Sequence, residues 1–298
     1  MTSLDGRAVV VTGAGRGLGE AFAVQLGLAG AMVVVNDVDG DSARRTAAEI
    51  RAQGHPAVAS DHSVSDPEQA QAIVDLCVSS FGRIDGLVNN AGLTYEAMPW
   101  EDDASRAREL IEVNVLGTVY TGLAALREMK RQGHGSIVNI SSGASLGQRT
   151  LGTYSASKGA VASLTYSWAL DLEAVGIRVN AVCPLAHTRM VWSSERALKK
   201  CPPDRTPDRI APLVVFLISE RSAGITGQMI RCNGPELHIV GQPYLKSPIL
   251  ERETWDAETI ERAFVEVFQA HLEPYGLEKR MPPRLRDWLT PPTPARTA

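Results

Sequence analysis

The chain has 298 residues, of which 44% are hydrophobic, and its 30 basic and 34 acidic side chains give a net charge of −4. A chain of this length can bury one large core or two smaller ones, and its weakly acidic balance argues against nucleic acid as a partner. Its apolar runs, such as residues 211–218, fall far short of the roughly 20 residues that span a bilayer, and its start lacks the shape of a signal peptide, so we expect a cytoplasmic protein without a membrane partner.

Short apolar runs alternate with longer helical patterns along the chain. The runs are mostly continuous, as expected for parallel strands that are covered by helices on both faces. We predict strands at residues 8–12, 31–36, 57–59, 86–89, 136–140 and 178–182, and helices at residues 16–29, 41–53, 66–81, 104–131 and 154–174. This order predicts an α/β protein with a Rossmann-type, doubly wound parallel sheet.

The pattern changes after residue 187. Residues 188–210 contain three prolines and no clear period, which predicts a mobile loop region with a short helix. We place the main domain at residues 1–234 and a C-terminal extension at residues 235–298. The extension contains an amphipathic helix candidate, starting near Thr254 or Asp256, whose apolar stripe would be Ile260, Phe264, Val267, Phe268 and Leu272. We expect this helix to pack on the core or on a neighbouring subunit, and the proline-rich end from Lys279 to be extended or disordered.

Four cysteines, at positions 77, 183, 201 and 232, are scattered along the chain. Their spacing is typical neither of a structural zinc site nor of a disulfide framework. We therefore expect ordinary reduced thiols and no bound metal.

The first predicted strand runs directly into TGAGRGLG, residues 12–19. A glycine-rich turn lets the backbone approach a pyrophosphate closely, and the N-terminus of the following helix, near Leu18, favours its negative charge. Gly13, Gly17 and Gly19 are therefore candidate cofactor-binding residues. The alternative is a purely structural turn.

Asp37 follows the second predicted strand, where a carboxylate would accept hydrogen bonds from the ribose of an adenosine. A negative charge there would also repel the 2′-phosphate of NADP, which favours NAD. Arg16, inside the glycine turn, would partly offset that repulsion, so NADP remains the second choice. In the alternative interpretation Asp37 only forms a turn, because NDVDGD is rich in turn residues.

Tyr154 and Lys158 lie four residues apart in TYSASKG, at the start of a predicted helix. Residues at this spacing share one helix face, about one turn apart. A lysine so placed would lower the pKa of the phenol towards working pH and make it a proton donor and acceptor. The alternative is a core tyrosine beside a solvated lysine.

Five motifs in order give these features a common context. TGxxxGxG at residues 12–19, NNAG at 89–92, an asparagine in EVNVLG at Asn114, NISS at 139–142 and YSASK at 154–158 resemble the short-chain dehydrogenase/reductase family. The likeness covers about residues 5–234. It implies a sheet of seven strands, a nicotinamide cofactor, and a homodimer or homotetramer.

The resemblance also implies catalytic roles. Tyr154 would be the general acid/base, and Lys158, together with the positive nicotinamide, would hold its pKa near working pH and bind the nicotinamide ribose. Ser142 would polarise the substrate oxygen, and Asn114 would anchor a water on the proton path. The segment between serine and tyrosine is one residue shorter than is usual in the family, so Ser141 is the alternative to Ser142.

The cofactor contacts implied by the resemblance include two departures from the family pattern. Leu185 follows Pro184 where the family has glycine, which leaves Thr188 as the contact to the carboxamide. Ser63 and Val64 stand where the family has Asp-Val after the third strand. The predicted cofactor-binding residues are Gly13, Arg16, Gly17, Leu18, Gly19, Asp37, Ser63, Val64, Asn90, Ala91, Gly92, Tyr154, Lys158, Pro184 and Thr188.

The segments VVVND, PLAHTRM and APLVVFLISE are similar to one subgroup, the (R)-3-hydroxyacyl-CoA dehydrogenase domain of peroxisomal multifunctional enzymes. We therefore predict an NAD-dependent oxidoreductase that interconverts a secondary alcohol and a ketone. Its substrate would be a fairly large apolar alcohol or a 3-hydroxyacyl thioester. The apolar wall would comprise Leu93, Tyr95, Leu146, Leu151, Met190, Val191, Trp192, Ala197 and Leu198.

Two other functions compete with this prediction. A non-catalytic NAD-binding sensor or scaffold would not need Asn114, Ser142, Tyr154 and Lys158 together. An epimerase or dehydratase of the extended relatives would space its glycines as TGxxGxxG rather than TGxxxGxG. His62, His187 and Trp192 are candidate substrate ligands, but residues of these types in loops more often serve local packing.

Overall fold

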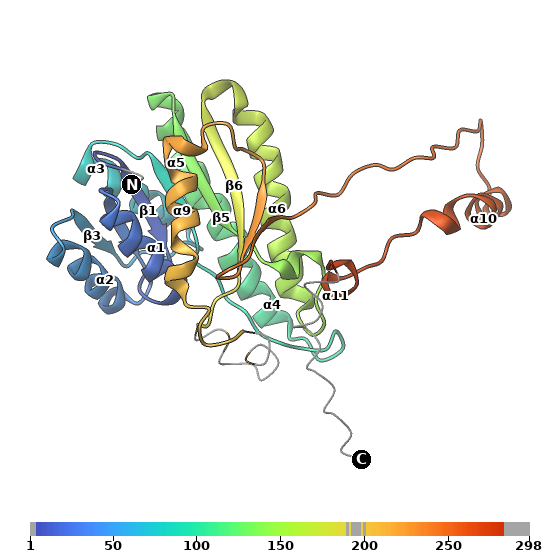
Figure 1. Cartoon of the computed structure of the whole chain (residues 1–298), viewed down its shortest axis with the longest axis horizontal. Helices are drawn as coiled ribbons and strands as arrows, with labels where there is room; N and C mark the ends of the chain where they lie inside the picture. Colours follow the sequence, from blue (N-terminus) through green and yellow to red (C-terminus); the bar gives the residue numbers. More distant parts are fainter. Residues whose placement is uncertain (1–3, 189–190, 192–197, 199–200, 283–298) are drawn as a thin grey trace, which may run out of the picture. The chain divides into compact units, whose positions relative to one another are not determined.

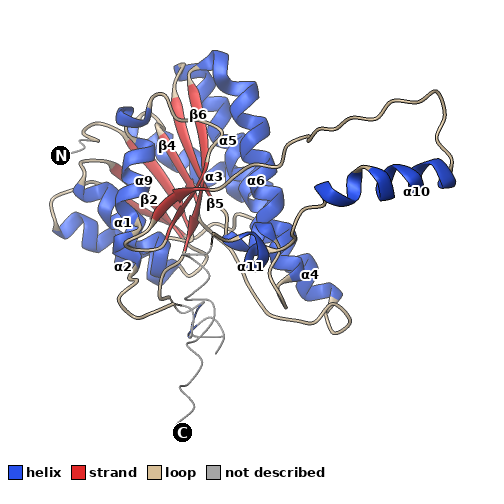
Figure 2. Cartoon of the chain, turned by 45° about the vertical axis from the view of Figure 1, so that its right-hand side comes forward, coloured by secondary structure: helices blue, strands red, loops and turns tan. Residues whose placement is uncertain are grey.

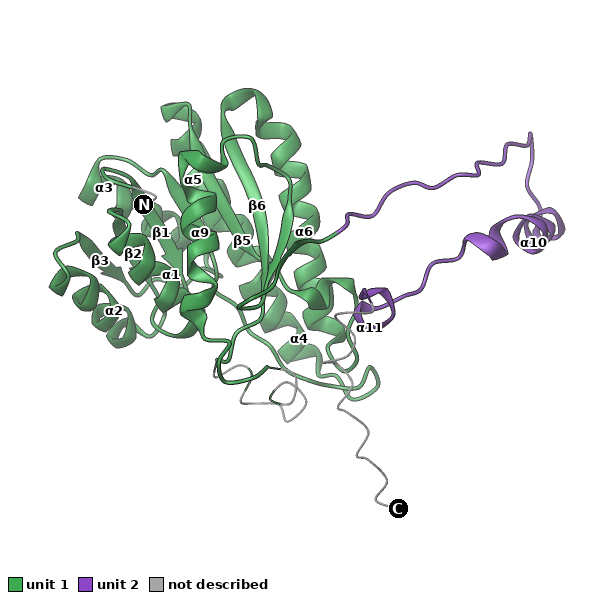
Figure 3. Ribbon diagram, viewed as in Figure 1, with its two compact units in different colours: residues 1–240 green, residues 241–298 purple. Residues whose placement is uncertain are grey.

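The computed structural model describes residues 4–188, 191, 198 and 201–282, which divide into two compact units, Met1–Val240 and Gly241–Ala298 (Figure 3). The predicted boundary lies after Gly234, whereas the first unit continues to Val240 because one more strand follows there. Each unit is described by itself below.

In the described part of the first unit, eight strands form one sheet in the order β3-β2-β1-β4-β5-β6-β7-β8 (Figures 1 and 2). The strands are β1 (Ala8–Thr12), β2 (Met32–Asn36), β3 (Ala57–Ser60), β4 (Gly86–Asn89), β5 (Gly135–Ile140), β6 (Ile177–Pro184), β7 (Met229–Cys232) and β8 (Leu237–Ile239). Neighbouring strands from β1 to β7 pair in parallel. The strand order reverses between β1 and β4, so the carboxyl ends of these two strands open the crevice in which such sheets bind ligands.

Helices cover both faces of the sheet (Figure 2). One face packs on α1 (Gly17–Leu28), α2 (Gly40–Ala52) and α9 (Ala211–Ile218), and the other on α3 (Pro67–Phe81), α5 (Gly117–Gln132) and α6 (Gly152–Leu172). Alternate residues of β1 face opposite layers: Val9 and Val11 join the first core, and Ala8 and Val10 join the second. Burial on both faces is the physical reason why the strands read as continuous apolar runs.

The helix predicted at residues 104–131 is continuous but not uniform. It consists of α4 (Ala104–Ile111), a π-helical stretch (Glu112–Leu116) and α5. By length and composition alone, Ala104–Gln132 could cross a membrane, a test that core helices also pass. Here the buried side of α5 packs on the sheet through residues such as Ala125 and Met129.

The eighth strand corrects the expectation of seven. β8 pairs with β7 in the antiparallel sense, and Arg231 faces His238 in the register. Residues 211–218, treated above only as an apolar run, form α9, in which most side chains are buried.

The second unit contains the predicted amphipathic helix in a shorter form. α10 (Ala257–Glu266) begins with a capping box, in which the Asp256 carboxylate accepts from the Thr259 amide and the Thr259 hydroxyl accepts from the Asp256 amide. The helix ends before Val267, and a 3₁₀ turn (Phe268–His271) and α11 (Leu277–Arg280) follow. Phe264 packs edge-on against Phe268 with ring centroids 5.4 Å apart. The predicted extended or disordered end lies mostly outside the described residues.

Candidate active site

Hydrogen bonds from the end of β4 fix the glycine-rich turn between β1 and α1. The Asn90 side chain donates to the carbonyl oxygens of Thr12 and Gly13, both at 2.9 Å. The backbone amides of Asn90 and Ala91 donate to the Thr12 hydroxyl at 3.0 and 3.1 Å. Gly19 packs so closely that an added Cβ would lie 2.1 Å from the Gly13 carbonyl oxygen. TGAGRGLG and NNAG are therefore parts of one structural unit at the crevice.

The first turn of α1 is not capped by a side chain. Its N-cap residue, Arg16, makes no side-chain cap hydrogen bond, whereas Asp39, Asp66 and Asp103 cap α2, α3 and α4. An uncapped helix N-terminus behind a glycine turn suits a pyrophosphate, because its amides and the helix dipole favour negative charge. The residues present thus fit a dinucleotide at the start of α1.

Asp37 lies directly after β2 and is 7% exposed. Its carboxylate accepts hydrogen bonds from the backbone amides of Gly15 and Asp39, both at 3.0 Å. Asp37 therefore stabilises the turn and lies beside the candidate cofactor site, so the two interpretations of this residue are compatible. Arg16 lies 3.8 Å from the Asp39 carboxylate. Gly15, inside the glycine motif, is thus a structural partner of Asp37 that the sequence alone does not indicate.

The structure brings the predicted catalytic residues Ser142, Tyr154 and Lys158 together at the carboxyl end of β5 and the start of α6. Ser142 follows β5, caps the 3₁₀ turn Gly143–Leu146 and lies close enough to the Tyr154 phenol to influence its pKa. Lys158 is 5% exposed, and its ammonium donates to the Ile140 carbonyl at 2.7 Å. The same nitrogen lies 5.8 Å from the centre of the Tyr154 ring.

The pKa of the phenol differs from the expectation. In the protein alone, burial raises the pKa of Tyr154 to about 12, and the neighbouring Ser142 hydroxyl opposes this shift. Burial also lowers the pKa of Lys158 to about 8, because a buried ammonium loses its hydration. The predicted lowering of the Tyr154 pKa by Lys158 is therefore not found among the protein's own groups. The lysine bonds to a backbone carbonyl rather than to the phenol.

Ser141 has a different environment from Ser142. It is 2% exposed, and its hydroxyl donates to the backbone carbonyl of Lys158 at 2.9 Å, which ties α6 to the end of β5. The Ser141 hydroxyl thus uses its proton within the fold, whereas the Ser142 hydroxyl accepts from the Ala144 amide at 3.1 Å and lies near the Tyr154 phenol. This geometry favours Ser142 as the substrate-facing serine.

Asn114 is fully buried in the π-helical stretch and is held on both sides. Its side-chain oxygen accepts from the Leu93 amide at 2.7 Å, and its nitrogen donates to the Leu93 carbonyl and to the Ser157 hydroxyl, each at 3.0 Å. Gly92 lies against it, since an added Cβ would be 3.3 Å from the Asn114 oxygen and 3.5 Å from the Lys158 ammonium. Asn114 and Gly92 therefore border the lysine, and Ser157 is a residue of this network that the sequence analysis missed.

The remaining predicted cofactor residues are placed as follows. Thr188 approaches the glycine turn, because a Cβ on Gly17 would lie 3.7 Å from its methyl group. Leu185, after Pro184 at the end of β6, donates its backbone amide to the Cys232 carbonyl at 3.0 Å. Val64 packs into the core below α5, and the Ser63 amide donates to the Gln69 side chain at 2.8 Å.

The histidines singled out in the sequence have local partners. His187 interacts with the Cys201 carbonyl at 3.0 Å, and His62 with the Ser60 hydroxyl at 3.1 Å. Of the wall candidates in the predicted loop region at residues 188–210, Met190, Trp192 and Ala197 lie outside the described residues. Across the part of the chain that the structure describes, no three His, Cys, Asp or Glu side chains gather as a metal site would require.

Comparisons with known proteins agree with this geometry. A family model described as short chain dehydrogenase matches residues 7–199. The chain is 36% identical over 239 residues to cis-4-hydroxycyclohexanecarboxylate dehydrogenase from Sinomonas cyclohexanicum, and the match covers 76% of this chain and 95% of that protein. The chain therefore belongs to the short-chain dehydrogenase family. It is an oxidoreductase of this family, which binds a nicotinamide cofactor and acts on secondary alcohols or ketones.

Three solved structures illustrate the range of the family around this fold. A short chain dehydrogenase from Mycobacterium avium matches with a TM-score of 0.81 and 31% identity, over 91% of this chain and 97% of that one. A 7α-hydroxysteroid dehydrogenase complexed with NADH and 7-oxo glycochenodeoxycholic acid matches with a TM-score of 0.73 and 31% identity, over 78% and 95%. A gluconate 5-dehydrogenase from Burkholderia cenocepacia in complex with NADP and tartrate matches with a TM-score of 0.72 and 32% identity, over 78% and 95%.

Proposed function

We propose that the protein is an NAD-dependent dehydrogenase that interconverts a secondary alcohol and a ketone by hydride transfer. The observation that carries this proposal is the assembly of Ser142, Tyr154 and Lys158 at the carboxyl edge of the sheet, bordered by Asn114. A protein that only binds a dinucleotide needs the glycine turn but has no use for this group.

Each side chain has a distinct task in the proposed reaction. Nicotinamide, when bound, accepts the hydride from the alcohol carbon or returns it to the ketone. Tyr154 exchanges the proton of the substrate oxygen, and Ser142 hydrogen-bonds that oxygen where negative charge develops. Lys158 would hydrogen-bond the nicotinamide ribose. Its charge, together with that of the bound nicotinamide, would lower the pKa of Tyr154 in the complex, an effect that the protein's own groups do not produce.

Tyr154→Phe tests the assignment directly. The substitution keeps the ring and removes the ionisable proton, so kcat should fall on the order of 10²- to 10⁴-fold. NADH should still bind, which fluorescence titration measures. Near-normal turnover in this variant would remove Tyr154 from the mechanism, and a wild-type protein that binds NADH without oxidising any alcohol would favour the sensor or scaffold.

The choice of NAD is supported by Asp37, whose carboxylate lies beside the glycine turn. The same position would bring it close to a 2′-phosphate. The solved relatives include one complex with NADH and one with NADP, so the family alone does not decide this point. The ratio of kcat/KM for NAD to that for NADP in the wild type is the measurement; a preference for NADP contradicts the proposal.

The proposed substrate is a fairly large apolar secondary alcohol, such as a cyclic or steroid-like alcohol or a 3-hydroxyacyl thioester. Support comes from two relatives whose names indicate a cyclohexane acid and a steroid, while the gluconate enzyme argues the other way. Among the described wall candidates, Leu93 and Leu198 are 38% and 40% exposed, so they can still gain burial from a substrate. Val191 is 8% exposed and serves the core instead.

A graded series of alcohols tests the substrate class. Each buried CH₂ contributes about 0.8 kcal/mol, so kcat/KM should rise several-fold per added carbon until the site is full. The series should include cis-4-hydroxycyclohexanecarboxylate, a hydroxysteroid, 3-hydroxyacyl-CoA esters and gluconate. Highest activity on gluconate, without a gain from apolar bulk, refutes the apolar site and leaves the dehydrogenase assignment intact.

The proposed assembly is a homodimer or homotetramer. In it, the second unit packs on the core or on a neighbouring subunit. Ile260 and Phe264 on α10 are each 45% exposed, and Leu272 is 58% exposed, which is unfavourable for apolar side chains in water. The Mycobacterium avium match covers 91% of the chain, more than the first unit alone provides (240 of 298 residues, about 81%). A chain ending at Val240 should lose assembly or solubility; unchanged mass and activity contradict the proposal.

A further inference from the structure

Two loops on either side of Tyr154 are joined by backbone contacts. One follows β4 and runs from Leu93 to the start of α4, and the other leads from the 3₁₀ turn into α6. The Ala97 amide donates to the Thr150 carbonyl at 2.8 Å, and Ala97 forms an isolated parallel bridge with Leu151. The loop after β4 is thereby fixed beside the first turn of α6.

A carboxylate reinforces this junction with two side-chain hydrogen bonds. Asp102 accepts from the Tyr95 phenol at 2.8 Å through one oxygen and from the Thr153 hydroxyl at 2.5 Å through the other. The Arg106 guanidinium lies 4.2 Å from the centre of the Tyr95 ring. We call Tyr95, Asp102 and Thr153 the loop clamp. Both oxygens of Asp102 are used, so the carboxylate joins the two loops through charge-assisted hydrogen bonds.

Thr153 immediately precedes Tyr154, and its place on the helix gives the clamp a consequence. Thr153 and Ser157 are four residues apart and form one row on α6, beside the row of Tyr154 and Lys158. The Ser157 hydroxyl donates to the Tyr154 carbonyl at 2.8 Å and accepts from Asn114 at 3.0 Å. The row next to the reactive pair is thus held at both ends, by Asn114 through Ser157 and by Asp102 through Thr153.

Two local features show why α6 gains from an external contact here. The helix starts at Gly152 after Leu151, which makes no side-chain cap hydrogen bond. Thr150 has a φ of 62°, a left-handed conformation that is unfavourable for a β-branched residue and needs support from its surroundings. The contacts of Ala97 and Asp102 supply that support on either side of Leu151.

We propose that Asp102 is a positioning residue for the general acid/base: through Thr153 it fixes the first turn of α6, and with it the Tyr154 phenol, opposite Ser142. This inference rests on the proposed function, because it assigns Asp102 an effect on proton transfer at Tyr154. Asp102 acts through Thr153. In the bonds described above it contacts neither the Tyr154 phenol nor the Lys158 ammonium directly.

The experiment uses the full-length protein with four single variants, one double variant and one matched control. Asp102→Ala removes the clamp, Thr153→Val and Tyr95→Phe each remove one hydrogen bond, and Thr153→Ser keeps the hydroxyl. The control is Asp103→Ala: the neighbouring carboxylate caps α4 by accepting from Ser105 and Arg106 but makes no bond to α6. The readouts are amide hydrogen exchange of residues 152–158, the dissociation constant of NADH, and kcat, KM and the pH profile of kcat with cis-4-hydroxycyclohexanecarboxylate and NAD.

The clamp predicts a specific set of results. Asp102→Ala and Thr153→Val should speed amide exchange in residues 152–158 and lower kcat by roughly 5- to 100-fold, because a displacement near 1 Å can cost about 10²-fold. The pH profile of kcat should shift, and the NADH dissociation constant should not. Thr153→Ser should stay within about twofold of the wild type, and the double variant Asp102→Ala/Thr153→Val should be no worse than either single variant, since both break the same contact.

Several outcomes would overturn the inference. If Asp102→Ala fails to fold, Thr153→Val and Tyr95→Phe decide alone, because each removes only one bond. Unchanged kcat, pH profile and exchange in Thr153→Val contradict a positioning role, as does an equal loss of kcat in Asp103→Ala. A wild type that oxidises no alcohol in the graded series refutes the proposed function instead, and the exchange measurement then still shows whether Asp102 holds the first turn of α6.

Discussion

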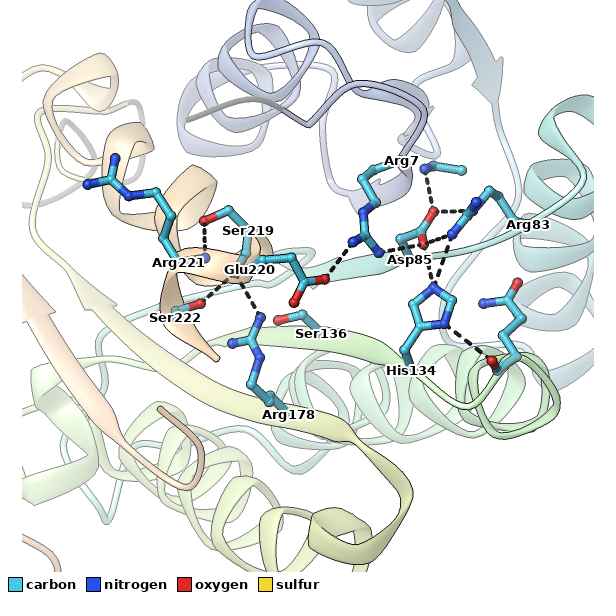
Figure 4. Close-up of polar contacts among 12 residues, drawn as sticks. Arg7, Arg83, Asp85, His134, Ser136, Arg178, Ser219, Glu220, Arg221 and Ser222 are labelled. Atoms are coloured by element: carbon cyan, nitrogen blue, oxygen red, sulfur yellow. Dashed lines mark hydrogen bonds and ion pairs between the residues drawn. The ribbon is translucent and has the colours of Figure 1, made fainter. Parts of the chain in front are cut away.

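Lys158 and Asp85 are both buried charged groups, but they lie at opposite ends of the parallel strands. Asp85 has several hydrogen-bond partners, and Lys158 has few. The Asp85 side chain is 2% exposed and lies just before β4, at its amino end (Figure 4). It accepts from Arg7 at 3.1 Å, Arg83 at 2.6 and 2.7 Å, His134 at 2.8 Å and the Ala8 amide at 2.9 Å. The Lys158 ammonium, at the carboxyl edge, makes one hydrogen bond within the described residues, to Ile140.

We infer that this difference separates a structural charge, Asp85, from a functional one, Lys158. Burial alone would raise the pKa of Asp85, but the bonds from Arg83, Ala8 and His134 outweigh it and lower the pKa. For Lys158 burial prevails and lowers the pKa to about 8. An ammonium has three donors, so Lys158 keeps capacity for a ligand that the saturated carboxylate lacks. The Asp85 carboxylate is thus saturated with donors, whereas the Lys158 ammonium is not.

The largest effect should come from Lys158→Met, which tests the functional side of this comparison. Turnover should fall on the order of 10²- to 10⁴-fold, because the positive charge beside Tyr154 is lost. Stability should change by less than about 1 kcal/mol, since loss of one hydrogen bond is offset by removal of a desolvated charge. Urea unfolding and steady-state kinetics measure both. A large loss of stability would mean that Lys158 is a structural charge like Asp85.

Asp85→Asn should give the opposite pattern. Removing the charge weakens the bonds from Arg7 and Arg83, which should cost about 1–2 kcal/mol of unfolding free energy because both guanidiniums are partly solvated. The lowered pKa of Asp85 means that its contribution is present above the unfolded value, near 4, and is lost as pH falls through the folded value. The unfolding free energy should therefore fall less in the variant than in the wild type as the pH is lowered below about 4. The kcat at neutral pH should remain near normal; a tenfold drop would contradict the separation.

The sequence predicts the candidate site around Tyr154 and Lys158 better than the hydrogen-bond cluster around Asp85. Motif positions such as Gly13, Ser142 and Tyr154 are recognisable because their chemistry requires particular residue types at particular spacings. The parallel strands are recognisable because they are buried on both faces. The partners of Asp85 come from three segments, and apart from Arg83, two residues earlier, nothing local to DGLVNN indicates them. Such contacts depend on the fold and have no periodic signature.

Three further features escaped prediction for physical reasons. β8 has only three residues, and its exposed Leu237 and Ile239 carry no burial pattern. The π-helical stretch around Asn114 lies inside a normal helical periodicity, so its altered backbone hydrogen bonds leave no trace in the pattern. The direction of the Tyr154 pKa depends on burial and on where the lysine nitrogen points, which i,i+4 spacing alone does not determine.

Asp37 is an intermediate case, a buried carboxylate at the catalytic edge that accepts from two backbone amides and forms no ion pair within the described residues. Asp37→Ala should reduce the preference for NAD over NADP by roughly tenfold, about 1.4 kcal/mol, because repulsion of the 2′-phosphate and the bond to the ribose are both lost. Asp37→Asn is the control, since it keeps an acceptor for the Gly15 amide and loses the charge. An unchanged ratio of kcat/KM in both variants would assign Asp37 to the turn alone.

The smallest effect on stability is expected from a new N-cap residue on α1. This test extends the comparison of partnered and unpartnered groups to the backbone amides at helix N-termini. Arg16 has φ −162° and ψ 164°, the extended conformation of an N-cap, but no side-chain cap bond. Arg16→Ser should therefore stabilise the fold by about 0.5–1 kcal/mol relative to Arg16→Ala, because its hydroxyl can accept from a free amide of the first turn. The same hydroxyl should compete with the cofactor phosphate, so NADH should bind several-fold more weakly to Arg16→Ser than to Arg16→Ala. The mirror experiment is Asp66→Ala on α3, which should cost about 1 kcal/mol and leave NADH binding unchanged. Equal NADH affinity in the two Arg16 variants, with the serine more stable, would show that the amides of α1 do not hold the phosphate.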